Sequence, residues 1–436
     1  MICKFQKMIV KKFVLSIYTK FLNKAYKSLT NGIDKRYTKM QVVIVKISDN
    51  TKNEKEKLPM KKFLAMMLAL AMVLSLAACG GSSEPAAEAP KADAPAAEAP
   101  AVEAPAEIAG KTVGVAMPTQ SSERWINDGG NMKKQLEALG YEVVLQYAED
   151  DVQMQVSQIE NMIAQGVDCL VIASIDSVAL TGVEAQAKEA GIPIIAYDRL
   201  LMQTDAVTYY ASFDNEGVGR AIAEYVEAKL DLANTTETYT IELFMGSPDD
   251  NNAVLLYNGV MKVIQKYLDN GTLVCKSGRT SFEETCILRW SQETAQKNCE
   301  DYLAGFYADE DLDICLTAFD GFAYGCRSAL EGAGYTAENW PIITGQDAEL
   351  MATKNIISGH QTMSIAKDTR TLAEKCVTMV NAVLTGSEPE INDTTTYDNG
   401  VFVVPSYLCT PVAVDVDNYQ EVLVDTGYYT AEQLAG

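Results

Sequence analysis

The chain has 436 residues, enough for two or three domains and a large hydrophobic core. Its charge is unevenly distributed: residues 1–59 carry 14 Lys/Arg against 4 Asp/Glu, whereas the chain from residue 63 onward holds 20 Lys/Arg and 55 Asp/Glu. Such an acidic body argues against nucleic acid or an anionic membrane surface as the ligand.

A secretion signal is predicted over residues 60–79. Two lysines follow Met60, residues 63–76 are apolar, and Leu76-Ala77-Ala78-Cys79 ends the segment with small residues and a cysteine. The apolar run is too short to span a membrane comfortably. The ending resembles the bacterial lipoprotein signal, which implies lipidation at Cys79 and an extracytoplasmic protein anchored to the cell membrane. A transmembrane anchor that ends in a chance cysteine is the alternative.

The segments on either side of this signal show no folded pattern. Because a signal should open a chain, we expect residues 1–59 to be an upstream segment that is not translated. Residues 80–109 repeat Ala, Pro and Glu, a composition that stays extended and unfolded. We expect this stretch to tether the lipid anchor to the folded body.

The body begins with strands that alternate with helices. Apolar runs at 112–117, 143–145, 169–173 and 193–197 indicate buried strands, and segments with helical period lie between them. After residue 215 the alternation restarts, with strands expected at 239–245, 273–275, 314–318 and 341–344. Near-continuous apolar strands between amphipathic helices predict parallel sheets covered on both faces. The fold class is therefore α/β, with two Rossmann-like lobes and a cleft between them.

Polar side chains follow the strands, at the edge where such sheets bind ligands. The most concentrated set, Asp249-Asp250-Asn251-Asn252, lies on a strand-to-helix turn, where a helix cap is the alternative explanation. Asp accepts, Arg and Lys donate and Asn does both, so the set suits vicinal hydroxyl groups. Trp125 and Trp290 offer ring faces for a sugar's C–H groups, although packing would explain either tryptophan equally well. The pattern favours a neutral sugar.

Several long motifs resemble the xylose-binding and multiple-monosaccharide-binding branch of the type I periplasmic binding proteins, over essentially all of the chain from Gly110. They are Ser121-Ser122-Glu123-Arg124-Trp125, Ala196-Tyr197-Asp198-Arg199, Gly246 to Ala253, Leu288-Arg289-Trp290, Gly345-Gln346-Asp347-Ala348 and Val403-Val404-Pro405-Ser406-Tyr407. The resemblance implies a receptor that delivers an aldose to an ABC permease, and in some cases to a chemosensory receptor.

The resemblance also implies the site and the lobes. Sugar contacts are expected from Arg124, Arg199, Asp250, Asn252, Trp290, Asp320, Asp347 and Lys367, with Trp125 and Asp249 nearby. Three crossings near Asn215, Lys367 and Pro405 would divide the chain into an N-terminal lobe, 110–214 plus 368–404, and a C-terminal lobe, 215–367 plus 405–436. Closure of the lobes would complete the site.

The sequence gives less support to other functions. Asp249 and Asp250 are adjacent, whereas glycoside hydrolysis needs two acids on opposite sides of a bond, and His360 has no nucleophile motif beside it, so we expect no enzyme. The acidic run 309–320 has Ile314 where a calcium loop needs Gly. No helix-turn-helix precedes the body, which disfavours a transcriptional regulator. A receptor for a furanose-like signalling molecule is the second hypothesis.

The body holds eight cysteines without a CxxC motif, so the sequence predicts no metal site and no cofactor. Several lie in strand or helix patterns, where Cys packs as a small apolar residue. We expect mostly free, buried thiols. The identity of the sugar does not follow from the sequence.

Overall fold

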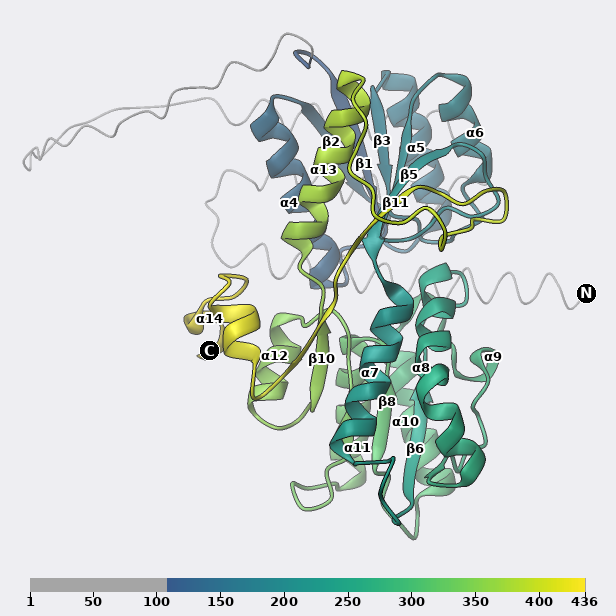
Figure 1. Cartoon of the computed structure of the whole chain (residues 1–436), viewed down its shortest axis with the longest axis vertical. Helices are drawn as coiled ribbons and strands as arrows, with labels where there is room; N and C mark the ends of the chain where they lie inside the picture. The colour runs from purple at the N-terminus through teal and green to yellow at the C-terminus, as the bar shows by residue number, and fades with distance from the viewer. Residues whose placement is uncertain (1–107, 436) are drawn as a thin grey trace, which may run out of the picture. The chain divides into compact units, whose positions relative to one another are not determined.

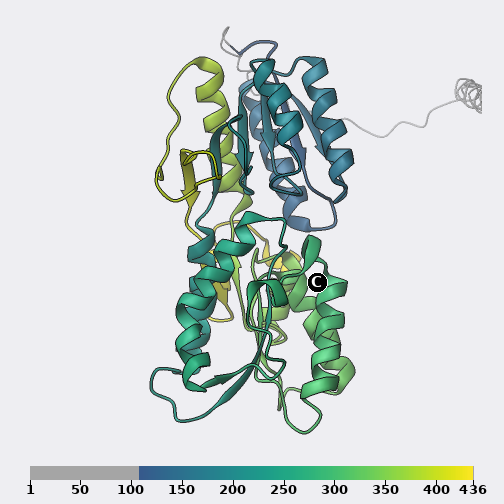
Figure 2. The ribbon, with the colours of Figure 1, turned by 90° about the vertical axis from the view of Figure 1, so that its right-hand side faces the viewer.

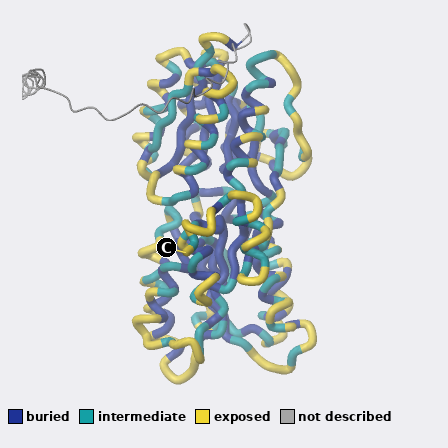
Figure 3. Tube along the Cα trace, turned by 90° about the vertical axis from the view of Figure 1, so that its left-hand side faces the viewer, coloured by how far each residue is buried: buried dark blue, intermediate teal, exposed yellow. Residues whose placement is uncertain are grey.

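The computed structural model describes residues 108–435. The predicted secretion signal, Cys79, the upstream segment and nearly all of the tether lie outside this part of the chain. The described residues form two α/β lobes, each built on its own sheet (Figure 1). Both lobes have buried strands at their centres and exposed residues mainly in loops and on outer helix faces (Figure 3).

The first lobe is a six-stranded parallel sheet in the order β11-β5-β4-β3-β1-β2. Helices α4 and α13 pack together on one face, and α5 and α6 cover the other (Figure 1). The strands are β1 Thr112–Met117, β2 Glu142–Tyr147, β3 Cys169–Ile172, β4 Ile194–Tyr197, β5 Val207–Phe213 and β11 Ser406–Cys409, and the helices are α4 Glu123–Leu139, α5 Val152–Gln165, α6 Thr181–Glu189 and α13 Thr369–Thr385.

The second lobe has a four-stranded parallel sheet in the order β7-β6-β8-β9 and a separate antiparallel pair, β10 and β12. Helices α7 and α8 pack on one face of the sheet, and α10 and α11 on the other (Figure 2). The strands are β6 Tyr239–Phe244, β7 Leu273–Val274, β8 Ile314–Thr317, β9 Ile342–Ile343, β10 Met363–Ala366 and β12 Val412–Asp415. The helices are α7 Asn215–Lys229, α8 Asn251–Asn270, α9 Phe282–Thr285, α10 Gln292–Phe306, α11 Asp320–Ala333, α12 Leu350–Ile357 and α14 Ala431–Ala435. A 3-10 turn lies at Leu288–Trp290 and a π-helical turn at Gln420–Val424.

Three segments connect the lobes. The first follows β5 at Asp214, and the second lies between β10 and α13 at Lys367 and Asp368. The third differs from the position expected near Pro405. The Pro405 carbonyl accepts a hydrogen bond from the Tyr210 backbone N–H at 3.1 Å, and β11 then pairs with β5 in the first sheet. Pro405 directly precedes β11, and this strand still belongs to the first sheet. The chain therefore passes to the second lobe only after Cys409.

The sequence pattern also missed several elements. β5 was not predicted, although its Tyr and Phe residues and its β-branched Val and Thr are typical of strands. The first helix, α4, begins at Glu123, so Arg124 and Trp125 belong to its first turn. Within residues 108–435, no helix combines the length and apolar character needed to cross a membrane.

Candidate functional site

A cavity of about 410 Å³ lies between the carboxyl ends of the two sheets. Its lining comes from both lobes and from the second connecting segment. Eight of the ten residues predicted for the binding site line it: Arg124, Trp125, Arg199, Asp250, Asn252, Trp290, Asp347 and Lys367. The other two, Asp249 and Asp320, lie behind the lining. The role of all ten in binding stays a prediction.

Arg124 lies in the first-lobe wall, the part of the cavity lining that the first lobe contributes, and pairs with three carboxylates. Its guanidinium donates to Asp128 at 2.9 Å, to Asp198, and across the cleft to Asp347 at 3.4 Å. The surrounding carboxylates raise the pKa of Arg124, although burial acts in the opposite direction. Burial would raise the pKa of Asp198, but Arg124 and then Lys367 hold it well below its usual range. Both groups are therefore charged, and the guanidinium has a fixed orientation.

Asp128 was missed in the sequence. It lies one helical turn after Arg124 on α4, is fully buried, and accepts a second hydrogen bond from the Tyr197 hydroxyl. Burial raises the pKa of Asp128 to about 6, and the charge of Arg124 opposes this shift. The i,i+4 spacing from Arg124 was the available signal, because residues at that spacing share a helix face.

Trp125 lies beside two cations. The guanidinium carbons of Arg124 and Arg199 are 4.7 and 5.0 Å from the centre of its ring system. Arg199 in turn pairs with Asp250 across the cleft at 3.0 Å and donates to the Ser174 carbonyl at 3.0 Å. Cation–π contacts in a desolvated site keep such side chains in place. The first-lobe wall therefore combines an indole with two oriented donors.

The Asp249–Asn252 turn both caps helix α8 and contributes to the cavity lining. Asp250 caps α8, its side chain accepting from the Asn252 N–H at 2.9 Å, and also faces the cavity. Burial raises the pKa of Asp250, and Arg199 opposes the shift. Asn252 donates to the Asp198 carbonyl at 2.8 Å. Helix capping and a cleft position, weighed as alternatives in the sequence, therefore occur together.

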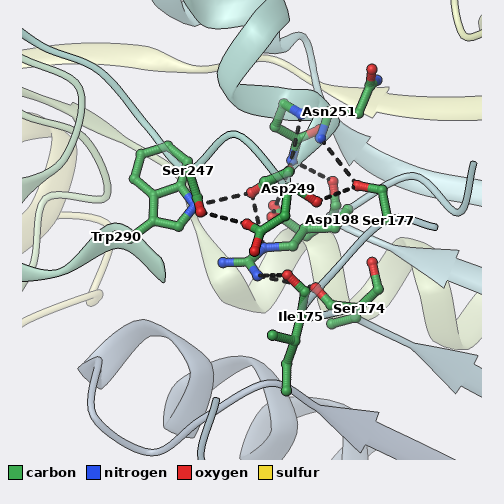
Figure 4. Close-up of polar contacts among 12 residues, drawn as sticks. Ser174, Ile175, Ser177, Asp198, Ser247, Asp249, Asn251 and Trp290 are labelled. Atoms are coloured by element: carbon green, nitrogen blue, oxygen red, sulfur yellow. Dashed lines mark hydrogen bonds and ion pairs between the residues drawn. The ribbon is translucent and has the colours of Figure 1, made fainter. Parts of the chain in front are cut away.

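Asp249 contacts protein groups on both sides of the cleft (Figure 4). Its carboxylate pairs with Arg289 at 2.5 Å and accepts from the Ser247 hydroxyl. Its carbonyl accepts from the Ser177 N–H and hydroxyl of the first lobe, both at 2.9 Å. Arg289 also donates to the Ile175 carbonyl at 3.2 Å. Asp249 thus belongs to a set of contacts that hold the lobes together.

Trp290 is the aromatic element of the second-lobe wall. It stacks on Phe322 with an interplanar angle of 16° and centroids 5.8 Å apart, and its indole N–H donates to Asp250 at 3.2 Å. The approach of Gly246 is so close that a Cβ there would lie 2.1 Å from the indole. Only glycine fits at this position while the ring keeps its place.

Asp347 and Glu349 follow the short strand β9, and the buried Asp320 follows the neighbouring strand β8. Glu349 accepts from the first-lobe Ser122 hydroxyl at 2.8 Å and from the Tyr324 hydroxyl at 3.1 Å. Burial raises the pKa of Glu349 to about 7, with the Asp347 charge acting in the same direction. Asp320 accepts from the Glu349 N–H at 2.9 Å, so it supports the loop from behind. Glu349 was also missed in the sequence.

Lys367 lies on the second connecting segment with only 3% of its surface exposed. Its ammonium nitrogen is 3.4 Å from Asp198 and 3.6 Å from Asp347. The cleft thus contains oriented donors, acceptors and two indoles, an arrangement suited to a neutral polyhydroxylated molecule. His360 lies outside the lining, where its ring packs against Trp340 and bonds the Ser358 hydroxyl.

Comparison with known proteins identifies the family. A model of the periplasmic binding protein domain matches residues 113–388. The chain belongs to the periplasmic binding proteins. The chain is 50% identical over 325 residues to the multiple sugar-binding periplasmic receptor ChvE of Rhizobium radiobacter, covering 74% of this chain and 92% of the relative. It is 34% identical over 322 residues to the D-xylose-binding periplasmic protein of Escherichia coli, with coverage of 74% and 92%.

Solved structures agree with this assignment. A solute-binding protein of an ABC transporter from Clostridium phytofermentans, solved with bound β-D-glucose, is 53% identical to this binding protein. The likeness covers 74% of this chain and all of the other, with a TM-score of 0.72. The predicted α/β architecture and the family resemblance are therefore confirmed. Membership in a family of binding proteins also supports the prediction that the chain is not an enzyme.

Proposed function

We propose that this binding protein captures a monosaccharide of the xylose, glucose, galactose or arabinose class between its lobes and delivers it to an ABC importer. The observation that carries the proposal is the cleft lining, in which fixed guanidinium, ammonium, carboxylate and amide groups surround a cavity flanked by two indoles. Relatives whose names specify multiple sugars or D-xylose, and a neighbour solved with glucose, support the same ligand class.

The proposed ligand contacts are those of the cavity lining. Arg124, Arg199, Asn252 and Lys367 would donate to hydroxyl oxygens, while Asp250 and Asp347 would accept from hydroxyl groups. Trp125 and Trp290 would bound the C–H faces of the ring. Asp249 and Asp320 would act through the residues that they hold.

We further propose that the lobes close by a hinge at the three connecting segments. The first lobe would comprise 110–214 and 368–409, and the second 215–367 with the remainder. The closed arrangement has direct interlobe bonds, so ligand binding would shift the population toward it by adding contacts from both walls. Lipidation at Cys79 would keep the protein at the cell membrane, next to the permease.

A second candidate is a receptor for a furanose-like signalling molecule, since the same donor and acceptor set would hold a five-membered ring. Delivery to a chemosensory receptor is compatible with either ligand. An aldopyranose ligand is favoured because the relatives of 50% and 34% identity are named for the binding of multiple sugars and of D-xylose.

Thermal unfolding of the purified protein, stripped of ligand, tests the proposal against a panel of aldoses and furanoses. A sugar present at about 100 times its dissociation constant stabilises the native state by roughly 2.7 kcal/mol. Stabilisation by one or several aldopyranoses is expected and names the ligand. Stabilisation by furanoses alone would favour the signal receptor, and no shift with any member of the panel would contradict monosaccharide capture.

A further inference from the structure

Three cysteines that the function does not use meet inside the second lobe. Cys299 lies on α10, Cys315 on β8 and Cys326 on α11, and all three are fully buried. Their sulfur atoms lie within 4.8 Å of one another. Within residues 108–435, no other His, Cys, Asp or Glu joins this group, which we term the trithiol. The sequence did not predict it, because its members come from three separate elements without a CxxC motif.

The trithiol is assembled by a close helix crossing. At Gly325, a Cβ atom would lie 2.7 Å from the Gln292 carbonyl oxygen and 2.8 Å from the Gln296 nitrogen. The absence of a side chain there lets the backbones of α10 and α11 meet. This contact places Cys326, the next residue, beside Cys299 one turn along α10. Cys315 completes the triangle from the sheet below.

We propose that Cys299, Cys315 and Cys326 bind one soft monovalent cation of the Cu(I) and Ag(I) class. Thiolate ligands select soft ions, and a three-sulfur set lacks the fourth ligand that structural zinc sites use. The centre of a triangle whose sides are at most 4.8 Å lies no more than about 2.8 Å from each sulfur, against about 2.3 Å for metal–thiolate bonds. An inward shift of at most about half an ångström completes the site. Binding releases the proton of any thiol that ligates as thiolate to the buffer.

Polar contacts join the partly buried Cys275 to Glu242, which lies beside Cys315 in the sheet. Glu242 on β6 is paired in register with Cys315 and is fully buried. Its carboxylate accepts from the Cys275 thiol at 3.5 Å, the Ser277 N–H at 3.0 Å and the Tyr307 hydroxyl at 2.7 Å. Cys275 is only partly buried, so it offers an incoming soft cation a first thiol contact.

Native mass spectrometry of the reduced full chain with Ag(I), in the presence of an excess of a small monothiol, tests the site. Single thiols lose the ion to this competitor, whereas the trithiol is expected to retain one Ag(I) per chain. The triple variant Cys299→Ala/Cys315→Ala/Cys326→Ala is expected to retain none, and each single variant to lower the apparent affinity at least about tenfold. Cys275→Ala is expected to slow loading without changing the final stoichiometry.

The matched control is Cys169→Ala/Cys376→Ala, which removes two fully buried thiols from the first-lobe core and should still retain one ion. Cooperative thermal unfolding of every variant checks that it is folded. Absence of a retained ion in the wild type, or equal retention by a folded triple variant, would overturn the proposal. So would a disulfide between two of the three cysteines in protein purified without reductant.

Discussion

The charged groups of the two cleft walls find their partners in different places. In the first-lobe wall, Arg124 is held by two carboxylates of its own lobe, Asp128 and Asp198, before it meets any group of the second lobe. In the second-lobe wall, Asp250 pairs with Arg199 across the cleft, and Asp347 pairs with Arg124 across the cleft and with Lys367 on the second connecting segment. The first wall is therefore preorganised, whereas the second depends on closure for its charge balance.

This difference predicts where substitutions act. Changes in the first wall should disturb the orientation of a donor that exists before ligand arrives. Changes in the second should act mainly on the closed state. The four predictions that follow test this comparison.

Arg124→Met should have the largest effect, because it leaves three buried carboxylates without their shared cation. We expect sugar affinity to fall by more than about 100-fold and the free energy of unfolding to drop by roughly 3–5 kcal/mol, the range for removing one partner of a buried ion pair. Calorimetric titration and urea unfolding measure both. Lys133→Met, at an exposed position of the same helix, should change neither. A loss of affinity below about tenfold would show that the first wall is not organised around Arg124.

Asp128→Asn tests preorganisation without removing the donor. Since burial raises the pKa of Asp128 to about 6, its carboxylate holds Arg124 as an anion above that pH and becomes neutral below it. We expect wild-type affinity to weaken several-fold between pH 7 and pH 5, and the variant to lose about tenfold at pH 7 but show a flatter profile. Glu349→Gln serves as the control for the second titrating group, whose pKa burial raises to about 7. An unchanged pH profile in Asp128→Asn would contradict a positioning role.

Trp290→Phe removes the hydrogen bond to Asp250 while keeping an aromatic ring against Phe322. A neutral-to-charged hydrogen bond contributes about 1.5 kcal/mol, so affinity should fall by about tenfold or less. Trp340→Phe is matched to it, because its indole N–H bonds the His360 carbonyl away from the cleft. Equal affinity losses in both variants would mean that the effect is general destabilisation rather than a property of the second wall.

Ser177→Ala should have the smallest effect. It removes the hydroxyl contacts to the Asp249 carbonyl at 2.9 Å and the Asn251 N–H at 3.2 Å, but keeps the backbone bond to Asp249. We expect affinity to fall about fivefold through faster ligand release, measured by stopped-flow fluorescence, since a net hydrogen bond contributes about 1 kcal/mol. Ser328→Ala on the exposed face of α11 is the control. A change confined to the association rate would contradict a role in holding the lobes closed.

Much of the fold was predictable because its signals are local. Apolar strands alternating with amphipathic helices indicated parallel sheets, and the polar residues after those strands indicated the cleft edge. The misplaced third crossing and the missed strand β5 have a common cause. Pairing between β5 and β11 joins segments almost 200 residues apart, and nothing local to Pro405 shows which sheet will accept it.

The site residues, like the fold, were predictable only in part. Strand-end position, residue type and the family resemblance pointed to eight residues that line the cavity, but they did not separate Asp250, which faces it, from the adjacent Asp249, which contacts Arg289 and Ser177. Neighbouring residues on a turn point in different directions. Only the packing of the turn between the lobes decides which one meets the ligand.

By itself, the sequence determined the α/β class, the two-lobe organisation and the chemistry offered to a ligand, because periodicity, strand-end position and side-chain type are properties of short segments. The tertiary structure decided the support of Arg124 by Asp128, the contacts of Glu349 across the cleft, and the meeting of Cys299, Cys315 and Cys326. Each of these depends on burial or on contacts between separate elements. Such contacts arise only when the helices and sheets have packed.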